Sequence, residues 1–340
     1  MLIFAQNCLK TVKGMFLFYV IFILVVFIGV PGLVWLVFWG LGKLLGIFIP
    51  LAAPIGKWTG TILSLGLIVC FVFGLTLGWR IVRIRHIELT FKDLPASFDG
   101  YKVAHLSDWH LGTYSKNHRT IEREVRKLLE EKPDLVVFTG DAVNYDPAEL
   151  EPFMGILSKL EAPDGVWSVM GNHDYCEYFP GNTPELQAAH IARLQEIEKE
   201  MGWNMLLNSN TVISNGRDSI ALVGVENDGQ PPFPQYADLG KALSGLPEGI
   251  FKIILSHDPT HWRRAILPET DIQLMLAGHT HAWQFRIGKL SPAMLAFKEW
   301  GGLYEEGGRK LFVSTGAGGN IPFRFGAWPE VDILVLRGEE

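Results

Sequence analysis

The distribution of charge divides this chain into two parts that suit different surroundings. Its first 79 residues contain four lysines and no acidic residue, whereas the remainder carries 26 basic and 36 acidic residues, a net charge of −10. Two runs in the first part, 14–42 and 58–79, contain no charged residue. A bilayer core about 30 Å thick needs roughly 20 apolar residues in a helix. The pattern predicts two transmembrane helices, near 15–39 and 59–79, in a membrane anchor of residues 1–80.

Basic residues beside these helices predict the orientation of the anchor. Lys10 and Lys13 precede the first span, and Arg80, Arg83 and Arg85 follow the second. Because positive residues tend to remain in the cytoplasm, both ends of the anchor are expected there. We therefore expect a multi-pass protein of the cell membrane whose following domain lies on the cytoplasmic face; a third span would reverse that face.

The interval between the two spans, 44–56, is expected to lie at the membrane surface or to re-enter it. As a helix it would rise only about 20 Å, and it contains Pro50 and Pro54. A cleaved signal peptide is the alternative interpretation of the N-terminus. It fits less well, because the first apolar run is longer than a signal core and a second run follows.

Residues 81–340 alternate short apolar runs, turn signals and amphipathic helices, as α/β domains do. Helices are predicted at 116–131 and at 184–201, the second beginning with a proline that suits a first helical turn. The glycine-rich stretch 301–319 is interpreted as loops around a single strand. Strands are predicted at 84–91, 102–107, 134–139, 166–170, 219–225, 251–256, 272–277, 310–315 and 331–336. The acidic balance of this domain argues against nucleic-acid binding, which usually needs a basic face.

Residues able to bind metal follow five of these strands, at the point where each strand ends. They are Asp108 and His110, then Asp141, then Asn172, His173 and Asp174, then His257, and finally His279 and His281. Ligands of open α/β sheets bind beyond the carboxyl ends of the strands, so these side chains are expected to meet in one crevice. The two-residue spacing of Asp108 and His110, shared by His279 and His281, lets both side chains point the same way and chelate one ion.

The residue types at these positions favour a particular class of metal. Carboxylate and imidazole groups suit divalent ions such as Mn, Fe or Zn, and the lack of a cysteine ligand argues against structural zinc. The choice among these ions and Mg is left open by the sequence. Gly140, Gly171 and Gly278 are expected to let the backbone turn sharply off their strands. Each element alone is a common chance event, but all five in this order are not.

The blocks Asp-x-His, Gly-Asp, Gly-Asn-His-Asp, a later His and Gly-His-x-His resemble the calcineurin-like metallophosphoesterase superfamily. The resemblance implies a sandwich of two β-sheets flanked by helices, with a two-metal site. It implies that the first ion is held by Asp108, His110, Asp141 and His281. It implies that the second is held by Asp141, Asn172, His257 and His279, so that Asp141 bridges the two ions.

The end of the chain is similar to a bacterial membrane-associated branch of that superfamily, which includes the YkuE-like and YaeI-like phosphodiesterases. Residues 321–325, Ile-Pro-Phe-Arg-Phe, and the later Pro329-Glu330 resemble the Pro-x-Arg-Phe and Pro-Glu pattern of that branch. Such relatives usually have Gly-His-Thr-His-Gly-Gly-Gln, whereas this chain continues with Ala282, Trp283 and Gln284. A bulky indole is therefore expected beside the site.

A two-metal site predicts roles for the residues beside it, since two cations bind phosphoryl oxygens and acidify a water molecule for in-line attack. Asn172 would be a neutral ligand that adds no negative charge opposite the phosphate. The side chain of His173 is expected to point away from that of Asn172 and so not to share its ion. His173 is therefore the candidate to contact the phosphate or to protonate the leaving oxygen. Asp174 is expected to orient His173 by a hydrogen bond, the alternative being a turn residue.

Other residues allow two interpretations each. Five aromatic residues are expected either in the core or along a groove for a lipid tail: Trp283, Phe285, Phe323, Phe325 and Trp328. Arg324 suits a phosphate contact or a structural ion pair. His105 is expected to be buried in a strand, and His261 to lie at the surface.

The favoured function is the hydrolysis of a phosphomonoester or phosphodiester, with a membrane-borne, lipidic substrate as one option. An alternative is a pyrophosphatase acting on a nucleotide-linked lipid A precursor, a reaction that some calcineurin-like enzymes perform. An alternative of another class is a non-catalytic membrane scaffold or receptor. Because every implied ligand position is filled, the scaffold is disfavoured, and a measurement of metal content separates it from the enzyme.

Overall fold

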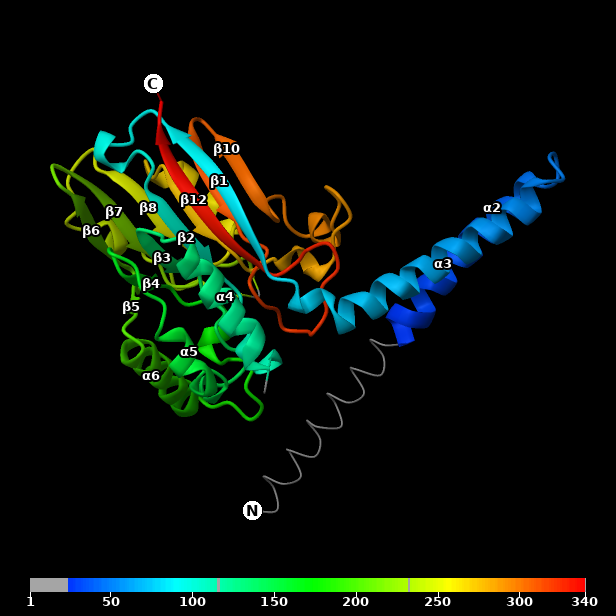
Figure 1. Ribbon diagram of the computed structural model, residues 1–340, viewed down its shortest axis with the longest axis horizontal. Helices are drawn as coiled ribbons and strands as arrows, with labels where there is room; N and C mark the ends of the chain where they lie inside the picture. The colour runs from blue at the N-terminus through cyan, green and yellow to red at the C-terminus, as the bar shows by residue number, and fades with distance from the viewer. Residues whose placement is uncertain (1–23, 115–116, 232, 340) are drawn as a thin grey trace, which may run out of the picture. The chain divides into compact units, whose positions relative to one another are not determined.

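The computed structural model describes residues 24–114, 117–231 and 233–339 (Figure 1). The chain divides into two compact units, Met1–Gly78 and Trp79–Glu340. Trp79, the first residue of the second unit, is 9% exposed in the core of that unit.

The first unit contains two apolar helices, α2 (Val30–Leu45) and α3 (Ala52–Thr76). The helical stretches that include them are long and apolar enough to cross a membrane. Glycine lies where the two helices meet: a Cβ on Gly56 would be 2.5 Å from the carbonyl oxygen of Phe38. Between the helices, Trp35 Nε1 donates to Thr61 Oγ1 over 3.1 Å. Small residues and polar bonds inside the pair are typical of helices that meet within membranes.

The connection between these helices is shorter than the sequence indicated. The helix α2 continues through Lys43 to Leu45, and α3 begins at Ala52. Pro54 lies in the first turn of α3, where its missing N–H removes no helical hydrogen bond. The prediction of a separate segment over 44–56 is therefore wrong. The start of the expected first span, residues 15–23, lies outside the described part of the chain.

The second unit is a sandwich of two six-stranded sheets (Figure 1). The first sheet runs β1 (Arg83–Phe91), β12 (Glu330–Gly338), β2 (Lys102–Leu106), β3 (Leu135–Phe138), β4 (Val166–Ser168), β5 (Asn204–Met205). The second runs β10 (Gly302–Glu306), β11 (Arg309–Val313), β9 (Leu274–Ala277), β8 (Phe251–Leu255), β7 (Asp218–Gly224), β6 (Ser209–Asn215). Apolar side chains of both sheets, such as Val137 and Leu276, fill the space between them.

The direction of the strands brings their carboxyl ends together. In the first sheet, β2, β3 and β4 are parallel, and in the second β7, β8, β9 and β11 are parallel. The strands β6 and β10 are antiparallel to their neighbours, and β12 is antiparallel to β2. In each sheet the loops after the parallel strands therefore emerge at one edge.

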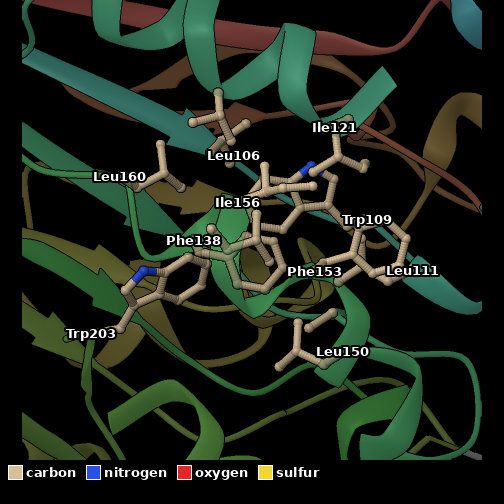
Figure 2. Packing of buried hydrophobic residues seen from close by; sticks show 14 of the residues in the cluster. Leu106, Trp109, Leu111, Ile121, Phe138, Leu150, Phe153, Ile156, Leu160 and Trp203 are labelled. Atoms are coloured by element: carbon tan, nitrogen blue, oxygen red, sulfur yellow. The ribbon is translucent and has the colours of Figure 1, made fainter. Parts of the chain in front are cut away.

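Helices cover the outer faces of the sandwich. The helices α4 (His118–Glu130), α5 (Met154–Leu157) and α6 (Pro184–Glu200) pack on the first sheet. Figure 2 shows this core, in which the ring of Trp109 stacks on Phe138 with centroids 4.9 Å apart. On the second sheet lie α7 (Leu239–Leu243) and the π-helical segment Trp262–Ile266.

The predicted α/β two-sheet fold is confirmed, and so are all nine predicted strands and both predicted helices of this unit. Three strands escaped prediction: β5, β6 and β10. Ile213 is the one buried residue of β6, so that strand lacks an apolar alternation. The interpretation of 301–319 as loops around one strand is wrong, because β10 forms a hairpin with β11 there.

Candidate metal centre

The seven predicted ligands all lie in loops at the carboxyl edges of the two sheets. The first sheet supplies Asp108, His110, Asp141 and Asn172 after β2, β3 and β4. The second supplies His257, His279 and His281 after β8 and β9. Every one of these side chains is at most 10% exposed. The convergence expected from strand order is therefore present.

Four residues form the first group. The Nε2 atom of His110 is 3.1 Å from Nε2 of His281 and 3.4 Å from Oδ2 of Asp141. His281 Nε2 is also 3.3 Å from Oδ1 of Asp108. The atoms of these residues that could bind a metal lie within 4.8 Å of one another.

The second group adjoins the first through a shared carboxylate. His257 Nε2 is 3.2 Å from Asp141 Oδ2 and 3.2 Å from Nδ1 of His279. The same Nδ1 atom is 2.9 Å from the amide oxygen of Asn172. Asp141 thus belongs to both groups, and each group contains a member from each sheet.

The hydrogen bonds around His257 test whether these groups fit a cation. Its Nδ1–H donates to the carbonyl of Thr139 over 2.6 Å, so Nε2 is the ring atom that faces Asp141. A buried carboxylate and imidazole that face each other need positive charge between them, which a proton or a metal cation can supply. Buried carboxylates and imidazoles have the donor chemistry of a divalent metal site. The residues present fit such an ion.

Burial and mutual charge shift the pKa values in the cluster. Burial raises the pKa of Asp108 to about 6 and lowers that of His110 to about 3. Burial also acts to raise the pKa of Asp141, but the imidazoles of His257 and His173 outweigh it and hold that pKa well below its usual range. Burial acts to lower the pKa of His257, yet Asp141 raises it to about 10. The shared carboxylate therefore stays ionised to a lower pH than Asp108 does.

The backbone of these loops is left-handed at most of the ligands. The φ angles are 56° at Asp108, 49° at His110, 59° at Asp141, 70° at His279 and 50° at His281. A residue other than glycine in such a conformation costs about 1–3 kcal/mol and persists where the surrounding structure enforces it. Strain of this kind gathers at functional sites, so the loops are shaped for their side chains.

The three glycines act differently from the prediction. Gly140 does have a positive φ of 91°, as a sharp turn requires. Gly171 and Gly278 do not, so the predicted sharp turn is wrong for them. A Cβ on Gly278 would lie 2.2 Å from Oδ2 of Asp108, and one on Gly171 would lie 2.3 Å from Oδ1 of Asp141. These two glycines allow the carboxylates to approach the backbone.

His173 lies beside both groups and lines the cleft above them. Its Nδ1–H donates to the carbonyl of Asn144 over 2.8 Å, which leaves Nε2 with no hydrogen-bond partner among the described residues. Its backbone N–H donates to Oδ1 of Asp141 over 2.9 Å. The ring is thus fixed by the chain before a substrate arrives.

The prediction that Asp174 orients His173 is wrong. Both oxygens of this buried carboxylate accept backbone N–H groups instead. Oδ2 accepts from Asp141 at 2.6 Å and from Gly171 at 2.9 Å, and Oδ1 accepts from Ala142 at 2.8 Å. Asp174 therefore ties the loop after β3 to the loop after β4.

Two supporting residues escaped sequence reasoning. The hydroxyl of Tyr178 accepts a hydrogen bond from Asn172 Nδ2 over 3.1 Å, which turns the amide oxygen toward the cluster. Oδ2 of Asp258 lies 3.5 Å from Nε2 of His279 and leaves Nδ1 facing the other ligands. A carboxylate directly after the ligand His257 was a signal for such support. Nothing in the sequence marked Tyr178.

A cleft of about 480 Å³ opens over the cluster. Its apolar wall contains Trp283, Phe233, Phe297 and Ile321. Trp283 is 50% exposed, so the expected indole does stand beside the site. A groove lined by all five predicted aromatics is wrong, since only Trp283 of the five lines this cleft. A larger hollow of about 790 Å³, near the β10–β11 hairpin, contains none of these groups.

Two further expectations require correction. Arg324 is 1% exposed and donates to the carbonyls of Gly318 and Ala327, so it is neither a phosphate contact nor half of an ion pair. His261 is buried rather than exposed, with Nε2 3.0 Å from Asp228 Oδ2. His105, in contrast, is fully buried as expected.

The fold and the buried His/Asp cluster define a metal-dependent phosphoesterase, and sequence comparison agrees. Residues 101–283 match the family model of calcineurin-like phosphoesterases. The chain belongs to this metallophosphoesterase family, which is a family of hydrolases.

Three relatives narrow the placement within the family. The uncharacterized metallophosphoesterase YkuE of Bacillus subtilis is 30% identical over 254 residues, which cover 72% of this chain and 82% of YkuE. The phosphodiesterase YaeI of Escherichia coli is 28% identical, over 76% of this chain and 89% of YaeI. A transmembrane protein with metallophosphoesterase domain from Danio rerio is 29% identical, over 84% of this chain and 64% of that protein. The resemblance predicted from the motifs is confirmed.

Proposed function

We propose that this chain is a membrane-anchored hydrolase of phosphomonoesters or phosphodiesters that uses two divalent cations bound side by side. One observation carries the proposal. Oδ2 of Asp141 is 3.4 Å from His110 Nε2 and 3.2 Å from His257 Nε2, so one carboxylate oxygen faces a histidine of each group. That arrangement suits a ligand shared by two ions.

The ligand sets follow the two groups. The first ion would be held by Asp108, His110, Asp141 and His281, and the second by Asp141, Asn172, His257 and His279. Two divalent cations supply positive charge for the phosphoryl oxygens and acidify a water molecule. Mn, Fe, Zn and Mg are all compatible with oxygen and imidazole donors.

His173 is the residue of the chain that we assign to proton transfer. Its Nδ1–H is held by the Asn144 carbonyl, so Nε2 is the atom that faces substrate. From there it would contact the phosphate or give a proton to the leaving oxygen. Asn172, held by Tyr178, adds a neutral donor and no charge that would repel the phosphate. Asp174 is a positioning residue, because its carboxylate holds the backbone of both loops.

The surfaces of the helices α2 and α3 are the evidence for a membrane anchor. They present large apolar side chains outward, such as Ile62 at 67% exposed and Leu33 at 63%, and bury glycine between them. An exposed apolar surface of this extent is unfavourable in water and favourable in lipid. With two spans, the flanking Lys and Arg residues favour a catalytic domain on the cytoplasmic face.

A panel of substrates and metals tests the proposal. Protein stripped of metal and reloaded with Mn, Fe, Zn or Mg is assayed on soluble phosphomonoesters, phosphodiesters and lipid-linked pyrophosphates. We expect ester hydrolysis that depends on metal and on His173, and the name of the relative YaeI favours diesters. Hydrolysis of pyrophosphates alone would move the function to the pyrophosphatase. A protein that binds no metal and cleaves nothing would be a scaffold.

A further inference from the structure

Exposed apolar side chains gather in one segment beside the cleft. We call them the apolar lip: Trp283 at 50% exposed, Ile287 at 57%, Leu290 at 66%, Met294 at 49% and Leu295 at 87%. Trp283 itself lines the cleft, so the lip begins at the mouth of the site. Single exposed apolar residues are ordinary, but a contiguous set marks a surface that is covered in use.

Hydrogen bonds to neighbouring segments hold the backbone of the apolar lip in place. The buried side chain of Gln284 donates to the carbonyls of Ile321 and Phe323, and Ser291 Oγ donates to the carbonyl of Ala282 over 2.7 Å. The backbone N–H of Arg286 donates to the carbonyl of Phe325 over 2.8 Å. The fold therefore holds the segment in place while it leaves its apolar side chains in water, a costly arrangement for a free surface.

The charge of this segment is opposite to that of its domain. From Trp283 to Lys298 it contains Arg286, Lys289 and Lys298 and no acidic residue, although the chain beyond residue 79 has a net charge of −10. Arg83 adds to this positive region, because the charge of Arg286 contributes, after burial, to a lowered pKa of Arg83. Exposed apolar side chains in a segment whose charges are all basic match the interface of an anionic bilayer.

The catalytic unit begins close to its own cleft. The second apolar helix ends at Thr76, and three residues later Trp79 is packed against Tyr114, with ring centroids 5.4 Å apart. Trp79 and Tyr114 border the same small hollow as Gln284 and Ile321, which also line the cleft. The first residue of this unit therefore lies beside the active-site cleft.

We propose that the apolar lip inserts into the surface of an anionic phospholipid bilayer and seats the cleft there, so that the enzyme takes phosphoesters presented by the membrane. The lipid-borne substrate rests on the proposed function, whereas the docking of the lip does not. A membrane is favoured over a protein partner because the unit begins at Trp79, near the cleft, only three residues after an apolar helix ends. Tethering raises the effective concentration of lipid at the lip without any new contact.

A depth measurement tests the docking independently of activity. Leu295→Cys is made in full-length protein that carries Cys8→Ser and Cys70→Ser; Cys176 is buried and stays. An environment-sensitive fluorophore on this site is read in vesicles of phosphatidylglycerol and phosphatidylcholine with spin-labelled acyl chains. We expect a blue-shifted emission and quenching by the acyl-chain label. The control Val212→Cys, 44% exposed on β6, should show neither effect.

Two outcomes of that measurement would overturn the proposal. A probe at Leu295 that reports water, as Val212 does, would mean that the lip is not in the bilayer. A probe that is shielded from water but not quenched by lipid would mean that protein, a second copy or another chain, covers the lip.

Kinetics test the consequence for substrate. Leu290→Gln with Leu295→Gln should lower the rate on a vesicle-embedded phosphoester by about tenfold or more, through lost apolar transfer. The rate on a soluble ester and the melting temperature should not change, which shows that the fold is intact. The matched control Val212→Gln should affect neither substrate. Unchanged vesicle activity in the double variant would refute a role in substrate capture. Absence of hydrolysis by the wild type on both esters would instead refute the proposed function and leave the depth measurement valid.

Discussion

The two sheets contribute to the metal centre in different ways. The first supplies Asp108, Asp141 and Asn172, hence every oxygen donor, together with His110, whereas the second supplies imidazoles only. Negative charge is thus concentrated on the first sheet, and imidazoles face it from the second. The backbone N–H of His279 donates to Asp108 over 3.0 Å and ties the two edges together.

The carboxylates that position the ligand loops, Asp174 at the first edge and Asp258 at the second, also differ in their contacts. Asp174 holds the first edge through backbone N–H bonds of 2.6, 2.8 and 2.9 Å. At the second edge Asp258 lies 3.5 Å from the imidazole of His279. The carboxylates of the cluster are therefore positioned by main-chain hydrogen bonds, whereas the carboxylate beside the ring of His279 lies beyond hydrogen-bond distance.

Removing the shared charge should break this arrangement most severely. Asp141→Asn removes the one carboxylate that faces both groups, so both cations lose a charge worth several kcal/mol. We expect activity to fall by more than about 10⁴-fold and the metal content to fall with it. Assay and metal analysis of the folded variant check this. Wild-type turnover would refute the assignment of Asp141 as a bridge.

The next largest effect should come from a residue that needs no metal bond. His173→Ala should keep both ions and lose about 10²–10⁴-fold in rate, the usual share of general acid catalysis. Metal content and the rate constant of the chemical step are measured on the same preparation. A collapse of metal content would make His173 a ligand or a structural residue.

A pair of matched variants sharpens the comparison of the two edges. Asp174→Asn places an N–H donor against backbone N–H groups and should lower the free energy of unfolding by about 2–4 kcal/mol. Asp258→Asn keeps an acceptor for the Thr260 N–H and should cost about 1 kcal/mol or less. Thermal unfolding of both proteins gives the difference. Equal losses would contradict a more firmly held first edge.

A separate effect, on the pH dependence of stability, concerns a carboxyl group behind the first edge. Burial raises the pKa of Glu124 to about 8, and Trp109 Nε1 donates to it over 2.8 Å. The folded state therefore binds a proton that the unfolded state releases near pH 4.3, so stability falls as pH rises from about 4.3 to 8. Glu124→Gln should remove up to about 1.4 kcal/mol per pH unit from that slope. Melting temperatures at several pH values decide it, and an unchanged slope would mean that Glu124 is ionised in the folded protein.

Side chains that act directly were predictable from the sequence, and those that act through the main chain were not. Spacing after strands placed the seven candidate ligands and His173 at one site, because strand ends and residue types are both visible in the sequence. Asp174 was identified, but its role depends on which backbone groups the two loops bring to it. Phe233 lines the cleft, but it lies in a loop whose sequence has no periodic or motif pattern. The polar strand β6 escaped for a similar reason, since its partner β7 stabilises it.

We propose that two cations lie at the carboxyl edges of the two sheets and share Asp141. Anomalous diffraction from crystals of the manganese-loaded protein tests this directly. We predict two peaks about 3.5–4 Å apart, one bounded by His110 and His281 and the other by His257 and His279, with the Asp141 carboxylate between them. A single peak, or two peaks that Asp141 does not bridge, would contradict it.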